Sequence, residues 1–454
     1  MSTATRADTP VPVPGVRGVP LVALARDPFG FCMKAAREGD GLVRLGAGPV
    51  RAYLVSHPDY VRHILVGNAA NYIKGSIMDG IRLALGNGLF TSDGDFWRRQ
   101  RRLMQPAFHN RQIQRMAETV RETVRDSMAG WAPAVTNGTP IDMLHESVRM
   151  NIRIILETLF GTAVDEERSV RLLDLTDRVF AGMTRRVWTF FVPSWLPTPG
   201  ATGYRRAIEA LDKEIYALIA ARRAALADGH AQEDLLSTLI QAEDSETGER
   251  MSDRQLRDEI FTIFIAGYES TATGVAWAWH LLCRHPEAAT RLREEVDRVL
   301  GGRAPGYDDL TELTYTRRVV DETFRLYPAF PMYFRGSVED DVVGPYAIPG
   351  GANIILSPYA THHDPRFWDD PEAFDPDRFA PDRYDSRARE AYYPFGKGQR
   401  LCIGEPMALT IAQLLIATIA QAYEVRTAPG VQVTGHYAMT YQPKHGLPVI
   451  LTPR

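Results

Sequence analysis

Cysteine and lysine are scarce in this chain of 454 residues, and neither sign of charge is in large excess. The three cysteines, Cys32, Cys283 and Cys402, are far apart and odd in number. This pattern predicts no disulfide framework and fits a reducing cytosol, and an odd number leaves at least one thiol available for other chemistry. Only five of the 52 basic residues are lysines, so 47 are arginines, a bias typical of a high-GC bacterial genome.

Basic charge and targeting signals are also lacking. The net charge of −4 and the pI near 6.3 exclude the basic field that nucleic-acid binding normally needs. Residues 1–20 have neither a cationic start with an apolar core nor the ~20 apolar residues of a membrane span. We therefore expect a cytoplasmic protein without a membrane anchor. The prolines of residues 1–20 predict an extended surface segment.

Apolar residues make up 45% of the chain and charged residues 24%, which predicts a globular protein with a large core. Between residues 58 and 330 the apolar spacing is mostly three to four, typical of helices. Strand patterns occur in a hairpin at 42–55, at 331–357 and near 431–451. No repeat or long polar linker interrupts the chain. The sequence predicts one domain over residues 1–454, mainly α with a minor β lobe.

Cys402 lies in the segment FGKGQRLCIG, directly before the apolar helix pattern MALTIAQLLIATIA. Backbone N–H groups and the positive end of a helix dipole stabilise a thiolate there, and a thiolate is the form that binds a metal. Gly398 and Gly404 allow sharp turns and close approach of a flat cofactor, and Arg400 could pair with a propionate. A lone cysteine is otherwise more often a small buried hydrophobe.

Five positions of this segment decide between the two interpretations. Phe395, Gly398, Arg400, Cys402 and Gly404 resemble the haem-binding signature of the cytochrome P450 superfamily. The resemblance implies the cytochrome P450 fold, haem b (iron protoporphyrin IX) as cofactor, and Cys402 as the axial iron ligand. Cys32 and Cys283 lack glycine or cationic neighbours of this kind and are expected to be structural.

A second motif is Glu322 and Arg325, three residues apart in a predicted helix that Pro328 should end. Taken alone, this is an ordinary surface pair. In the resembled family, the two side chains form a buried triad with an arginine of a later motif, here Arg378 in FDPDRF. A structural role follows from the resemblance.

Other arginines resemble residues that bind the haem propionates. Trp97 and Arg101 lie at i and i+4 of a predicted helix, and the family uses this pair on a propionate. Arg335, in a strand-like run, and Arg400 match two further propionate partners. The alternative for each is an ordinary surface arginine.

Ser252 and Gln255 form a predicted capping box that starts a helix running to residue 285. Midway, Ala266, Gly267, Ser270, Thr271 and Gly274 make one face of small and hydroxylic residues. A flat group could lie against this face, and close helix packing would explain it equally well.

The segment AGYEST resembles the oxygen-activation motif of the family, with Glu269 as the acid and Ser270 where threonine is usual. We expect Ser270 and Glu269 to deliver protons, with Thr271 the next candidate. The alternative is a hydroxyl that bonds back to the carbonyl of Ala266.

By resemblance, the substrate cavity is lined mostly by apolar and aromatic side chains. A flexible entrance rich in aromatics is expected near residues 187–200. A lipophilic substrate follows, of terpenoid, polyketide or fatty acyl type. The lining residues expected from the resemblance are Phe90, Phe264, Phe330, Met332 and Met439.

The resemblance covers nearly the whole chain, so no fused reductase is expected. It implies a monomeric monooxygenase that uses O2 and NAD(P)H-derived electrons delivered by a ferredoxin or flavodoxin and its reductase. A basic patch of Arg98, Arg99, Arg102 and Lys397 would steer such an acidic partner, unless it is only a solvated charged face. The alternatives are a haem-thiolate isomerase or peroxygenase, against which Glu269 and Ser270 argue, and a non-catalytic haem sensor.

Overall fold

The structure is a computed structural model that describes residues 11–15, 27–45, 51–75, 78–161, 166–188, 200–230, 234–437 and 439–454. The chain forms two compact units, and neither is one continuous segment. Unit 1 comprises Met1–Asp79, Pro331–Ala373 and Asp385–Cys402, and unit 2 comprises Gly80–Phe330, Phe374–Tyr384 and Ile403–Arg454.

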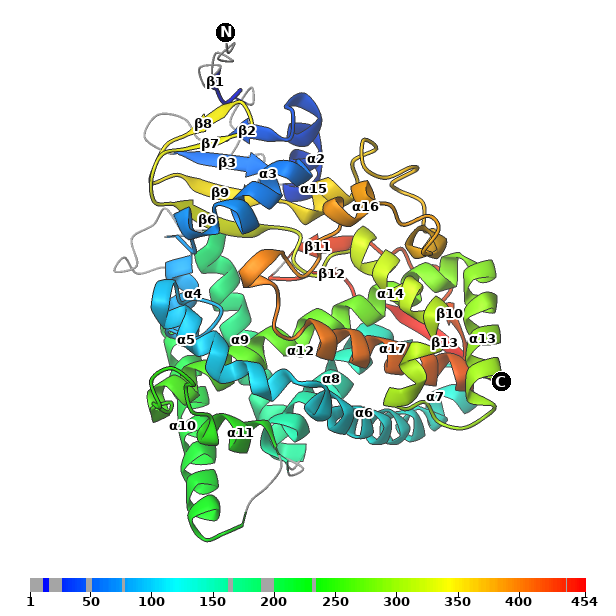
Figure 1. The fold of residues 1–454 in the computed structure, drawn as a ribbon. Helices are drawn as coiled ribbons and strands as arrows, with labels where there is room; N and C mark the ends of the chain where they lie inside the picture. The colour runs from blue at the N-terminus through cyan, green and yellow to red at the C-terminus, as the bar shows by residue number, and fades with distance from the viewer. Residues whose placement is uncertain are drawn as a thin grey trace. The chain divides into compact units, whose positions relative to one another are not determined.

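Unit 1 is built around a five-stranded sheet in the order β2-β3-β9-β6-β4. The predicted hairpin is confirmed, because β2 and β3 pair antiparallel with Val43 opposite Leu54. Distant segments meet here, and Figure 1 shows the blue strand β3 beside the yellow strand β9. The strands are β2 (Leu42–Arg44), β3 (Ala52–Val55), β4 (Tyr72–Ile73), β6 (Tyr333–Ser337) and β9 (Asn353–Leu356).

A second sheet of unit 1 joins β1 (Val11–Pro12) to the hairpin of β7 (Asp341–Val343) and β8 (Tyr346–Ile348). Residues 11 and 12 therefore pair with β8. Of the predicted extended segment, residues 1–10 and 16–20 lie outside the described residues. The helices of unit 1 are α2 (Pro28–Glu38), α3 (Pro58–Arg62), η1 (His63–Gly67), η2 (Ala69–Asn71), α15 (Pro358–His362), α16 (Ser386–Ala391) and η7 (Gly398–Arg400).

Unit 2 holds the long helices, so the prediction of a mainly α chain with a minor β part is confirmed. Within it, α12 packs against α8, α10, α14 and α17 (Figure 1). The helices are α4 (Asp79–Leu85), α5 (Gly94–Met104), η4 (Gln105–Phe108), α6 (Asn110–Gly130), α7 (Ala132–Asn137), α8 (Met143–Phe160), α9 (Glu166–Trp188), α10 (Ala201–Ala227), α11 (Leu235–Gln241), α12 (Asp253–Arg284), α13 (Pro286–Leu300), η5 (Tyr307–Thr311), α14 (Thr314–Leu326), η6 (Pro376–Phe379) and α17 (Glu405–Ala422).

Helix α12 begins and ends as its sequence predicts. The Ser252 hydroxyl accepts from the Gln255 N–H, and the Gln255 side chain accepts from the Ser252 N–H, so the capping box is present. The helix ends at Arg284, just before Pro286, which cannot continue it. Buried side chains occur all round its middle, so α12 is a core helix.

Two small sheets complete unit 2: β5 (Ile141–Asp142) with β10 (Tyr423–Thr427) and β13 (Pro448–Pro453), and β11 (Gly435–Tyr437) with β12 (Tyr441–Pro443). The strands expected near residues 431–451 are thus present. Among the described residues, each sheet therefore lies within a single unit. Residues 189–199 of the predicted aromatic entrance lie outside the described residues.

Among the described residues, α17 is the one helix long and apolar enough to cross a membrane, with a mean hydropathy of 1.2. However, 61% of it is buried inside the structure, as in the core helix of a globular protein.

Candidate active site

The loop that carries Cys402 is closed by its own backbone. The Cys402 N–H donates to the Phe395 carbonyl at 3.0 Å. Gly398 has φ +69°, and a Cβ there would meet the Leu65 carbonyl oxygen at 2.3 Å, so the turn requires glycine. Gly404 differs from expectation: its φ of −87° suits any residue, so it is not a turning glycine.

The three cysteines have different surroundings. Cys402 is exposed, which is unusual for a residue type that is mostly buried. Cys32 is only 1% exposed beside the Met332 sulfur, and burial raises the pKa of its thiol to about 12. Cys283 donates to the Val425 carbonyl at 3.4 Å, and burial raises its pKa also. Reactive thiolate chemistry is therefore disfavoured at Cys32 and Cys283.

Tyr333 supports the same loop, and the sequence did not reveal it. Its hydroxyl donates to the Pro394 carbonyl, which ties β6 to the chain just before Phe395. Burial, and then the negative charge of Cys402, raise the pKa of Tyr333 well above its usual value. The phenol therefore stays neutral and keeps its O–H to donate.

The predicted propionate partners lie on β6, η7 and α5. In unit 1, the buried Arg335 of β6 donates to its neighbour's carbonyl, that of Phe334, at 2.7 Å, and Arg400 lies half-buried in η7. In unit 2, α5 carries the buried Trp97 and the half-buried Arg101 one turn apart. The contact of these side chains with a haem remains a proposal.

The small residues of α12 divide into two sets. A Cβ on Gly267 would meet Ile155 of α8 at 2.8 Å, and one on Gly274 would meet Phe324 of α14 at 2.4 Å. These glycines serve close helix packing, so Gly267 is better explained by packing than by the predicted cofactor contact. Ala266 is exposed and Ser270 half-exposed, although most of α12 around them is buried. That face can receive a flat group.

The Ser270 hydroxyl donates to the Ala266 carbonyl at 2.8 Å, which is the alternative that the sequence left open. The bond uses its single proton and leaves its oxygen lone pairs to accept a hydrogen bond. Thr271, the next residue, is buried. The Ser270 oxygen can therefore still accept a hydrogen bond from a proton donor. Its own bond to the Ala266 carbonyl fixes the side-chain rotamer.

Asn151 of α8 is a further residue of this site that the sequence did not reveal. Its buried amide nitrogen donates to the carbonyls of Gly267 and Tyr268 at 2.6 and 2.7 Å. These carbonyls belong to the segment that contains Glu269 and Ser270. Asn151 therefore holds the backbone of the motif from the neighbouring helix.

We expect Asn151→Leu to lower the free energy of unfolding by about 1–2 kcal/mol, because two hydrogen bonds are lost. Asn151→Asp has the same shape but sets carboxylate oxygens against two carbonyl oxygens, so it should destabilise the protein more. Urea unfolding of the holoenzyme measures both. An equal decrease in the free energy of unfolding in the two variants would contradict the bonds assigned to the Asn151 amide nitrogen.

Glu269 is buried at 8% exposure, and its carboxylate accepts from the Thr440 hydroxyl at 2.6 Å. Burial raises its pKa to about 7; the Thr440 bond opposes this effect, and the charge of Asp177 adds to it. Near neutral pH, both protonation states of Glu269 are accessible.

A second buried glutamate holds the segment that contains Phe90. Glu259 of α12 accepts from the Leu89 N–H at 2.9 Å and from the Gln100 amide at 3.1 Å, while Asp258 accepts from the Asn87 N–H at 2.9 Å. Burial raises the pKa of Glu259 to about 8. The acidic pair inside an apolar helix was the signal in the sequence that could have pointed to this contact.

The other predicted lining residues are mostly packed. Phe264, Met332 and Met439 are buried, and Phe330 is half-buried. The Met332 sulfur lies 4.0 Å from the Cys32 sulfur, so its contact is with α2 in unit 1.

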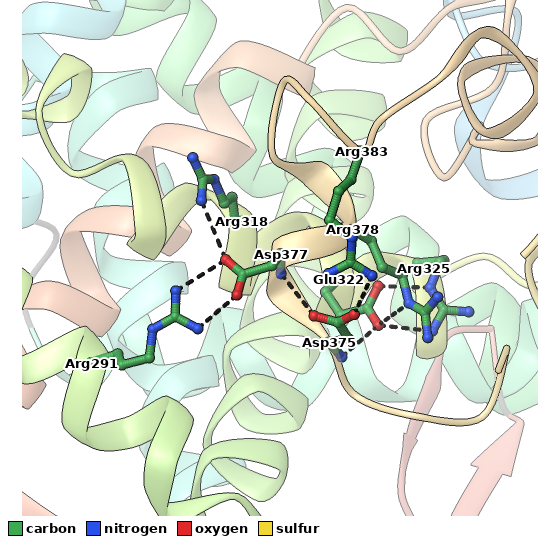
Figure 2. A network of polar contacts seen from close by, with 8 residues as sticks. All are labelled: Arg291, Arg318, Glu322, Arg325, Asp375, Asp377, Arg378 and Arg383. Carbon is green, nitrogen blue, oxygen red and sulfur yellow. Dashed lines mark hydrogen bonds and ion pairs between the residues drawn. The ribbon is translucent and has the colours of Figure 1, made fainter. Parts of the chain in front are cut away.

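The structure brings Glu322, Arg325 and Arg378 together. Arg325 donates to both oxygens of Glu322 at 2.7 and 2.9 Å, and Arg378 donates to one of them at 3.1 Å. Glu322 and Arg325 have no exposed surface. Figure 2 shows this buried cluster beside a second, more exposed one, in which Asp377 binds Arg291 and Arg318.

The expected basic patch differs in the structure. Arg99 pairs with Asp244 and Glu249, and Arg102 pairs with Asp244 and Glu246. Arg98 pairs with Asp95, and in unit 1 Lys397 pairs with Glu390. The prediction of a basic patch is wrong, because acidic side chains pair with all four cations, and the partners of Arg99 and Arg102 are distant in the sequence.

The chain is similar to known proteins both in sequence and in structure. Over residues 9–445 the chain matches the family model described as Cytochrome P450. It is 37% identical over 417 residues to the cyclooctat-9-en-7-ol 5-monooxygenase of Streptomyces melanosporofaciens, covering 91% of this chain and 89% of that protein. It is 36% identical to the pentalenene oxygenase of Streptomyces avermitilis, covering 91% of each. The crystal structure of the cytochrome P450DA haem domain matches 98% of both chains, with a TM-score of 0.88 and 27% identity.

Proposed function

The chain belongs to the cytochrome P450 family and is one of its monooxygenases; on that premise, we propose that it inserts one oxygen atom of O2 into a lipophilic terpenoid. Its electrons come from a separate ferredoxin or flavodoxin and an NAD(P)H-dependent reductase. The chain acts in the cytoplasm as one monomeric catalytic domain.

The residues present fit haem b as the cofactor. An exposed Cys402 in a glycine-dependent turn supports its role as the iron ligand, and the exposed Ala266 and half-exposed Ser270 of α12 support a haem face there. Arg101, Arg335 and Arg400 would hold the propionates. When bound, haem with a thiolate ligand supplies the oxygen-activating chemistry.

One observation carries the monooxygenase function most directly. Oxygen activation consumes protons. Burial raises the pKa of Glu269 to about 7, and the oxygen of its neighbour Ser270 can accept a hydrogen bond. Glu269 would take protons from solvent, and Ser270 would orient a water in line. An isomerase or peroxygenase, the second candidate class, has no use for this pair.

Ser270→Ala tests the proposal. We expect unchanged haem spectrum and substrate binding, but reducing equivalents diverted to hydrogen peroxide, because the water loses its acceptor. Ser270→Thr should couple at least as well as the parent, since threonine keeps the hydroxyl and is stiffer at χ1.

The assay is product formed per NADPH consumed, with a surrogate reductase, alongside peroxide released. Product formation from peroxide alone, with none from NADPH, would favour the peroxygenase. If Ser270→Ala couples like the parent, the hydroxyl is structural.

The substrate class rests on relatives and on side chains. Relatives named for cyclooctatin and pentalenene favour a terpenoid over a polyketide or a fatty acyl compound. Phe90, Phe264 and Met439 would supply an apolar lining. Screening terpenes against matched fatty acids by displacement of the axial water distinguishes these classes.

A further inference from the structure

Thr440 lies directly before β12, and the backbone of the next residue, Tyr441, is held at both its N–H and its carbonyl. The Tyr441 N–H donates to the Ala329 carbonyl at 3.0 Å, and the Tyr441 carbonyl accepts from the Trp277 indole of α12 at 2.7 Å. Trp277 in turn stacks on Tyr327, with ring centroids 4.0 Å apart. These contacts place residue 440 independently of its own side chain.

From that position the Thr440 hydroxyl, at 1% exposure, reaches the Glu269 carboxyl at 2.6 Å. The two residues are 171 positions apart. We propose that Thr440 is a positioning residue for proton delivery: it holds the Glu269 carboxyl in one orientation and stabilises its ionised form. The inference rests on the proposed role of Glu269.

The groups around Glu269 determine how strongly the Thr440 hydroxyl affects the ionisation of its carboxyl. Asp177 of α9 repels a negative charge on Glu269, and Tyr268 uses its hydroxyl to bind Asp177. From α8, the neutral Asn151 donates to the carbonyls of Gly267 and Tyr268, just before Glu269. Burial and Asp177 both disfavour the carboxylate, whereas the Thr440 hydroxyl donates to it and favours it.

The same contact joins two predicted parts of the site. Met439, which precedes Thr440, is an expected substrate-lining residue, and Glu269 precedes Ser270.

The test is a titration of the Glu269 carboxyl in the holoenzyme by infrared difference spectroscopy, with the band assigned by its loss in Glu269→Gln. We expect a midpoint near pH 7 in the parent. Thr440→Val has the same shape without the hydroxyl, and its midpoint should rise by about one pH unit, the size of one hydrogen bond to a charged group. Thr440→Ser, the matched control, should keep the parent midpoint.

Coupling of product to NADPH is measured over the same pH range with the terpene selected by the binding screen. The pH midpoint of coupling should follow that of the carboxyl. Relative to the parent, it should be higher in Thr440→Val and unchanged in Thr440→Ser. An unchanged carboxyl midpoint in Thr440→Val overturns the inference. If Glu269→Gln couples like the parent at every pH, the proposed role of Glu269 fails instead, and the two failures are distinguishable. Should Thr440→Val lose haem, Thr440→Ala tests the same bond.

Discussion

Replacing Cys402 by alanine should abolish the red-shifted Soret band of the reduced, carbon monoxide-bound protein and, with it, product formation. The reason is chemical: a thiolate ligand produces that band, and an alanine cannot ligate iron. We expect complete loss rather than a graded decrease. The measurement is the reduced-CO difference spectrum, with haem content and far-UV circular dichroism recorded in parallel.

Cys283→Ala is the matched control for this variant. Its thiol donates to the Val425 carbonyl, and its raised pKa keeps it protonated, so the spectrum should not change. Persistence of the thiolate band in Cys402→Ala would refute the assignment of the axial ligand. Its disappearance in Cys283→Ala would do the same.

Glu322→Gln should be the most destabilising substitution away from the haem. Its carboxylate accepts from two guanidinium groups and from the Asp375 N–H, with no exposed surface. Removing one partner of a buried ion pair leaves the other charge uncompensated, which costs about 3–5 kcal/mol. Urea unfolding of the holoenzyme, followed by haem release and circular dichroism, measures the change.

The neighbouring cluster in Figure 2 supplies the control. Arg291 binds both oxygens of Asp377 at 2.7 and 3.0 Å, but its side chain is 50% exposed. Water screens this pair, so Arg291→Gln should lower the free energy of unfolding by less than about 1 kcal/mol. Similar decreases in the free energy of unfolding for Glu322→Gln and Arg291→Gln would show that burial does not set the strength of the triad.

Local patterns made much of the molecule predictable. The capping box and the prolines define where α12 begins and ends, because helix termini have orphan backbone groups that only certain residues satisfy. The first hairpin followed from two apolar-rich runs separated by the segment GAGP. The segment around Cys402 was recognisable because its motif is contiguous, and the requirement for glycine at 398 is a property of one turn.

Motifs misled where their partners were distant. Arg99 and Arg102 predicted a cationic face, but they pair with Asp244, 142 residues beyond Arg102, and with its neighbours Glu246 and Glu249. Gly267 read as a cofactor contact, and Ile155 of α8 explains it better. Asn151, Thr440 and Tyr333 carry no recognisable pattern, since a single polar residue in a helix, turn or strand is unremarkable until its partner is known.

By itself, then, the sequence determined the helical core, and it pointed to Cys402, Glu269 and Ser270 as candidate site residues. Periodicity, capping and contiguous motifs depend on residues a few positions apart, whose relative placement the backbone already sets. Only the tertiary structure decided what those side chains touch. It shows that Ser270 bonds to the Ala266 carbonyl and that Glu269 bonds to Thr440. It also shows the burial that raises the pKa of Glu269. Desolvation and hydrogen bonding depend on which distant segments pack around a group, so the sequence alone could not give them.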